Sequence, residues 1–134
     1  MKIEINFNPV AVASILIIED EKIILENLND LLEIFGYDCF TANNGVDGLM
    51  LGQNKLPDLI ICDISLPGLN GFQVKAELNK SKETALIPFI YLTARAEKSS
   101  KTEGLALGAN AYIIKPFKIN ELVEIVEKYI QHIH

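Results

Sequence analysis

Acidic residues directly follow two apolar runs that are typical of buried strands. Glu19, Asp20 and Glu21 come after the run 15–18, and Asp63 comes after the run 59–62. Carboxylates that converge repel one another and raise each other's pKa values, and a hard cation such as Mg²⁺ relieves this repulsion. A carboxylate beside Mg²⁺ can act as a nucleophile toward phosphorus. These residues therefore point to metal-assisted phosphoryl chemistry at Asp63, whereas a solvated helix start is a sufficient explanation for Glu21.

Two further polar residues follow apolar runs later in the chain. Thr93 comes after 88–92, and Lys115 comes after 111–114. A phosphoryl group in transfer carries its charge on the equatorial oxygens, so positioned cations and hydrogen-bond donors supply most of the catalysis. We expect the Lys115 ammonium to pair with one such oxygen, and the Thr93 hydroxyl and Ala94 amide to reach another. The predicted site thus combines a nucleophile, a cation that pairs with a phosphoryl oxygen, and hydrogen-bond donors.

The elements that must position these residues alternate along the chain. The expected strands are 14–19, 37–42, 59–62, 88–92 and 111–114. The expected helices are 22–35, 45–55 (with Val46, Leu49 and Met50 on one face), 72–79, 98–107 and 119–130. This alternation predicts an α/β fold with a parallel sheet covered on both faces. If the strand order is 2-1-3-4-5, a common doubly wound arrangement, the first and third strands are neighbours at the switch point, where ligands bind.

Four motifs together resemble the receiver domain of two-component response regulators. They read ILIIEDE at 15–21, CDISLPGLNG at 62–71, LTA at 92–94 and GANAYIIKPF at 108–117. The resemblance runs from about residue 15 to 130, and Asp63 followed by Pro67 and Gly71 is its most specific part. It implies a flavodoxin-like (CheY-like) doubly wound five-stranded parallel sheet of order 2-1-3-4-5. We expect a receiver domain over 14–131, with tails at 1–13 and 132–134.

The resemblance also implies a role for each matching residue. Asp63 is expected to be the phosphoacceptor, and Asp20 a direct ligand of Mg²⁺. Glu19 is expected to act on the metal through water, and Ser65 to offer its backbone carbonyl. Lys115 precedes a proline, and this bond is similar to the family's cis peptide, which only proline makes accessible.

A switch pair is the second implication of the resemblance. The Thr93 hydroxyl is expected to move toward the phosphoryl group and the Tyr112 ring to turn inward behind it. The readout surface would comprise the helix expected at 98–107, the strand at 111–114 and the last helix. The expected phosphodonor is a sensor histidine kinase or a histidine phosphotransfer protein. The chain would not be an enzyme in the usual sense, although it would assist its own phosphorylation and autodephosphorylation.

Composition limits the partners. The 134 residues suit one domain, the formal net charge is −6, and Arg95 is the single arginine. Because no basic cluster occurs, we expect no direct nucleic-acid binding. No apolar run is long enough for a bilayer, so we expect no membrane association. Cys39 and Cys62 lie in apolar strand-like runs and are expected to be buried, which fits a reducing, cytoplasmic location.

Three other interpretations compete with the phosphoacceptor. A flavin- or nucleotide-binding domain would need a Gly- or Ser-rich loop where this chain has acidic residues. A haloacid-dehalogenase-like phosphatase would need a second aspartate at Ser65. A pseudo-receiver would keep the fold as a binding module without phosphorylation. The resemblance also departs from one dimerisation style, because Asn110 and Ala111 replace an acidic pair and the last helix lacks arginine.

Overall fold

A five-stranded, wholly parallel sheet forms the centre of the molecule, in the order β2-β1-β3-β4-β5. The computed structural model describes residues 12–94 and 107–131. Its strands are β1 (Ser14–Ile18), β2 (Asp38–Ala42), β3 (Leu59–Asp63), β4 (Phe89–Thr93) and β5 (Ala111–Ile114). The predicted fold class and strand order are confirmed. The helix expected at 98–107 and most of both expected tails lie outside the described residues.

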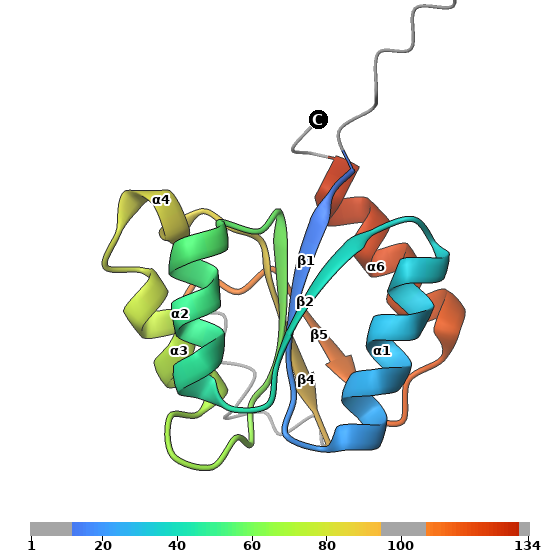
Figure 1. The fold of residues 1–134 in the computed structure, drawn as a ribbon, viewed down its shortest axis with the longest axis horizontal. Helices are drawn as coiled ribbons and strands as arrows, with labels where there is room; N and C mark the ends of the chain where they lie inside the picture. Colours follow the sequence, from blue (N-terminus) through green and yellow to red (C-terminus); the bar gives the residue numbers. More distant parts are fainter. Residues whose placement is uncertain (1–11, 95–106, 132–134) are drawn as a thin grey trace, which may run out of the picture.

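Helices cover both faces of the sheet. They are α1 (Lys22–Ile34), α2 (Gly45–Lys55), α3 (Gly71–Leu78), the single-turn α4 (Lys82–Ala85) and α6 (Ile119–Gln131). Figure 1 shows α1 and α6 on one side of the sheet and α2, α3 and α4 on the other. None of the helices in these described ranges is long and apolar enough to cross a bilayer. The sequence did not predict α4, whose one turn falls in a stretch treated as a connection.

Strand residues alternate between two cores. Ile15 and Ile17 of β1 pack with α1 and α6, whereas Leu16 and Ile18 pack with α2 and α3. Every residue of β3 is buried, as expected for a parallel strand between two helical layers. Each fully buried aliphatic side chain contributes about 1.5–3 kcal/mol. The uninterrupted apolar runs therefore stabilise the packing of both helical layers on the sheet.

Glycines form the part of helix α2 that lies closest to the sheet. Of the three apolar residues predicted on one face, Val46 and Met50 are 56% and 54% exposed, whereas Leu49 is half-buried against the core. The buried positions are instead Gly45, Gly48 and Gly52. A Cβ at Gly48 would lie 2.5 Å from Cδ1 of Ile18, so a side chain at that position would require Ile18 to shift.

Smaller differences concern α1 and β2. Helix α1 ends at Ile34, one residue before its expected end, and Gly36 follows with a φ of 93°, a conformation that favours glycine. Phe35, at the expected end of the helix, is 47% exposed. Cys62 is buried as predicted, but Cys39 on the outer strand β2 is only half-buried. An edge strand has one unpaired side, which explains the greater exposure of Cys39.

Candidate functional site

Three carboxylates meet at the carboxyl ends of β1 and β3. Glu19 and Asp20 directly follow β1, and Asp63 is the last residue of β3. The two strands are hydrogen-bonded neighbours, with Ile18 opposite Cys62. One carboxylate oxygen from each of the three acids lies within 4.8 Å of the others. The strand order thus produces the convergence that the sequence predicts.

Lys115 reaches this cluster from the carboxyl end of the edge strand β5. Its backbone N–H donates to the carbonyl of Thr93 (2.8 Å), which holds it at the end of β5. Its Nζ donates to Oδ2 of Asp63 (3.1 Å) and to Oε1 of Glu19. The Lys115–Pro116 peptide bond is cis, as the resemblance implies. Lys115 therefore pairs with two of the three acids. From the sequence, its ammonium was expected to pair only with an oxygen of the phosphoryl group.

Backbone groups hold the Asp63 carboxylate in place. The backbone N–H of Ser65 donates to Oδ1 of Asp63 (3.0 Å), a contact that the sequence did not predict for Ser65. Gly71 begins α3 and donates its N–H to the carbonyl of Ile64 (3.1 Å). A Cβ at Gly71 would lie 2.5 Å from the Asp63 carbonyl oxygen. Sequence reasoning treated Gly71 as a loop marker, but its missing side chain lets α3 close against the end of β3.

Burial and crowding set the protonation of the acids. Burial, followed by the hydrogen bond with Asp63, raises the pKa of Glu19 to about 8, although Lys115 opposes this. Burial also acts to raise the pKa of Asp63, but its hydrogen bonds with Glu19 and the Ser65 amide, together with Lys115, lower it below the usual value. Without a metal, Glu19 thus holds a proton near neutral pH while Asp63 stays anionic.

The donor set fits a small hard cation. Metal binding requires ionised carboxylates. When Glu19 and Asp63 are both ionised, Oε2 of the fully buried Glu19 has no hydrogen-bond partner among the described residues. Buried charged oxygens are normally satisfied by a donor or a metal. Three carboxylates at this separation, with Asp20 exposed to solvent, match the oxygen ligands that Mg²⁺ prefers.

The two residues expected to switch lie on neighbouring strands. Thr93 ends β4, opposite Ile114, and Tyr112 lies two residues earlier on β5, opposite Tyr91. The half-buried Tyr112 ring contacts Tyr91, with 5.5 Å between the ring centroids. Tyr91 in turn packs edge-on against Phe72 of α3. Tyr112 is therefore positioned between the sheet edge and an aromatic core cluster.

Comparisons with known proteins agree with this geometry. Residues 15–127 match the response regulator receiver domain. The phosphate regulon transcriptional regulatory protein PhoB of Pseudomonas aeruginosa is 41% identical over 110 residues, which are 82% of this chain and 48% of PhoB. Protein PilH of the same species is 37% identical over 114 residues, covering 85% of this chain and 94% of PilH. The chain thus spans about half the length of PhoB but nearly all of PilH.

Solved structures give the same result. Chemotaxis protein CheY4 of Vibrio cholerae has a TM-score of 0.85 at 28% identity, covering 89% of this chain and 99% of that one. The receiver domain of a sensor histidine kinase of Pseudomonas aeruginosa has a TM-score of 0.83 at 29% identity, covering 90% and 99%. That structure contains a magnesium ion coordinated in its active-site cleft. Fold, strand-end acids and sequence motifs agree, and the chain belongs to the response regulator receiver domain family.

Proposed function

We propose that this receiver domain accepts a phosphoryl group on Asp63, in the presence of Mg²⁺, from a sensor histidine kinase or a histidine phosphotransfer protein. The observation that carries the proposal is the buried contact of Lys115 with Asp63 and Glu19, beside the exposed Asp20. A structural salt bridge would need one acid for one base. Here one ammonium pairs with two of three clustered acids, and this surplus of negative charge suits a divalent cation and a charge-bearing reaction.

The chemistry is a displacement at phosphorus. An oxygen of the Asp63 carboxylate forms the new P–O bond, and the P–N bond of the phosphohistidine breaks. The imidazole leaves with the electron pair of that bond and regains a proton from solvent. The Ser65 amide fixes the orientation of Asp63, and Lys115 offsets charge on the phosphoryl oxygens.

Four groups would hold the metal in this scheme. Asp20 and Asp63 would bind Mg²⁺ directly, Glu19 through water, and Ser65 through its backbone carbonyl. Bound Mg²⁺ supplies positive charge to the oxygens of the transferring phosphoryl group.

Phosphorylation would act as a conformational switch. The aspartyl phosphate carries about −1.5 to −2 charges beside Lys115 and Thr93, in place of the single negative charge of the Asp63 carboxylate. We propose that the Thr93 hydroxyl and the Ala94 amide contact the phosphoryl group and that Tyr112 turns inward against Tyr91, which alters the face formed by β5 and α6. The domain acts in signalling and is no metabolic enzyme. Its autodephosphorylation, its downstream effector, its cytoplasmic location and the boundaries 14–131 stay predictions.

Intact mass spectrometry tests the phosphoacceptor. The chain is incubated with acetyl phosphate, with and without Mg²⁺, beside Asp63→Asn and a matched control, Asp30→Asn, at an exposed position of α1. We expect one hydroxylamine-labile phosphoryl group, dependent on Mg²⁺, in the wild type and in Asp30→Asn but not in Asp63→Asn. If neither acetyl phosphate nor any phosphohistidine donor labels the wild type, the chain is a pseudo-receiver that works by binding alone.

A further inference from the structure

A groove lies at the opposite end of the sheet from Asp63. It has a volume of about 560 Å³, and its walls come from the connection before β3, the connection before β4, the residue before β5 and α6. Asp58 lines it immediately before β3, whereas Asp63 ends that strand. The two lie roughly 16 Å apart at about 3.3 Å per residue. The groove is thus separate from the phosphoryl site.

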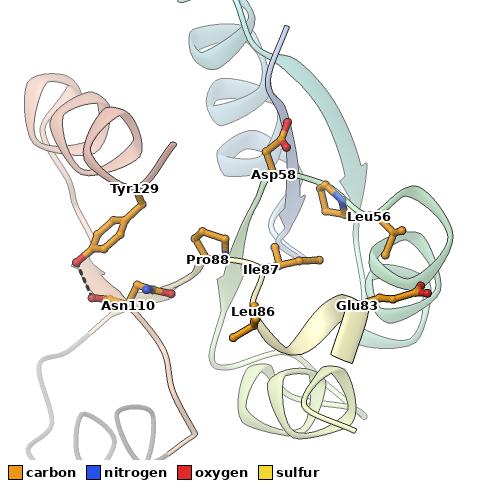
Figure 2. A pocket seen from close by; sticks show the side chains of 9 residues that line it. Leu56, Asp58, Glu83, Leu86, Ile87, Pro88, Asn110 and Tyr129 are labelled. Carbon is orange, nitrogen blue, oxygen red and sulfur yellow. Dashed lines mark hydrogen bonds between the residues drawn. The ribbon is translucent and has the colours of Figure 1, made fainter. Parts of the chain in front are cut away.

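The groove has an aliphatic surface that nothing in the described chain covers. Leu86 is 88% exposed and Leu56 is 45% exposed, and Ile87 lies between them. Figure 2 shows Ile87 and Pro88 between a wall made by Tyr129 and Asn110 and a second wall made by Leu56 and Glu83. Aliphatic side chains gathered in a concave surface mark a recognition site more often than single exposed ones do.

Internal hydrogen bonds hold these walls in place. The Tyr129 hydroxyl donates to the backbone carbonyl of Asn110 (2.8 Å), and Oδ1 of Asn110 accepts from the backbone N–H of Phe89 (2.9 Å). The backbone N–H of Ser14 donates to Oδ2 of Asp58 (2.7 Å). A partner therefore meets a surface that needs little ordering on binding, which favours affinity.

The charge of the groove selects its occupant. Asp58 and Glu83 line it, and no basic residue of the described chain does. The ammonium of Lys128 lies 5.4 Å from the centroid of the Tyr129 ring, which lines the groove. Two carboxylates repel the phosphates of nucleic acids and of anionic lipids. A second copy of this chain would bring the same carboxylates and a net charge of −6.

We propose that the groove binds a short segment of a partner polypeptide in which an aliphatic side chain adjoins a lysine or arginine. The aliphatic group packs on Leu86, and the cation pairs with Glu83, because Oδ2 of Asp58 already accepts from the backbone N–H of Ser14. The inference does not rest on phosphorylation of Asp63. It gives the domain a second interaction surface, at the opposite end of the strands from the phosphoryl site.

Nuclear magnetic resonance of the ¹⁵N-labelled full chain tests this inference. The probe is the peptide acetyl-Ala-Leu-Arg-Leu-Ala-amide, and the control is the same peptide with glutamate in place of arginine. We expect saturable shifts of the Leu86 and Ile87 amides and of the Asn110 side-chain amide with the arginine peptide alone. Leu86→Ser should weaken its binding about tenfold, because an exposed anchor is lost without disturbing the core.

A matched variant controls for general hydrophobic binding. Ile23 on α1 is 73% exposed, so Ile23→Ser removes a similar side chain elsewhere on the surface and should leave binding unchanged. Glu83→Gln should weaken binding about threefold through the lost charge. Equal shifts from both peptides, shifts that do not saturate, or Leu86→Ser binding as tightly as the wild type would each overturn the proposal.

Discussion

Alanine substitution at two glycines of α2 should move stability in opposite directions. A Cβ at Gly45 would lie 2.0 Å from the backbone oxygen of Leu69, in the loop that leads from Asp63 to α3. Neither backbone can move away without disturbing its own element, so Gly45→Ala should cost about 3 kcal/mol. A Cβ at Gly52 would meet only side-chain carbons, the nearest at 3.4 Å. Gly52→Ala should therefore gain about 0.5–1 kcal/mol from the lower entropy of the unfolded chain.

Urea unfolding followed by circular dichroism measures this difference. With an m-value of roughly 2 kcal/mol/M, the two variants should differ in midpoint by about 2 M. Gly48→Ala should fall between them, because the side chain of Ile18, whose Cδ1 would lie 2.5 Å away, has some freedom to rotate. A Gly45→Ala variant as stable as Gly52→Ala would refute the close approach of α2 to the loop at Leu69.

Three further predictions concern buried polar groups and a helix cap. Burial lowers the pKa of Lys75, so the folded protein loses this proton before the unfolded chain does. The free energy of unfolding should rise as pH increases from that lowered pKa toward 10.5, and Lys75→Met should abolish this slope in urea titrations from pH 7 to 10. Asn70→Ala removes the capping box with Gln73 and should lower the melting temperature by about 4 °C, measured by calorimetry. Burial raises the pKa of Glu19 to about 8, so the metal-free protein must protonate this side chain on folding near neutral pH; Glu19→Gln removes that cost and should stabilise the metal-free protein, while Mg²⁺, which should raise the wild-type melting temperature, should raise that of the variant much less.

The sequence predicted the sheet well, and the reason is physical. A strand buried between two helical layers must be apolar on both faces, so it appears as an uninterrupted run such as 15–18 or 59–62. The candidate site followed from the same runs. The carboxyl ends of parallel strands lie together at one end of the sheet. Glu19, Asp63 and Lys115 therefore had to lie near one another once the strand order was known.

Other features leave no signal in hydrophobic periodicity. That pattern looks for large apolar side chains, so it grouped Val46, Leu49 and Met50 on one face and overlooked the glycines that bring α2 against β1. Lys75 is 2% exposed although its type predicts a solvated face. Its Nζ donates to the carbonyl of Ala85 (3.1 Å) at the end of α4, a tertiary contact that local sequence does not encode.

The charge balance of the phosphoryl site argues for its use as a switch. Glu19, Asp20 and Asp63 carry three negative charges when ionised, and Lys115 returns one positive charge. The remaining two negative charges equal the charge of one Mg²⁺, so a bound ion would bring the site to neutrality. A phosphoryl group on Asp63 adds negative charge again, and it does so where Thr93 and the start of the next connection lie. Under the proposed function, phosphorylation would give this balanced site an excess of negative charge, beside Thr93 at the end of β4 and Lys115 directly after β5.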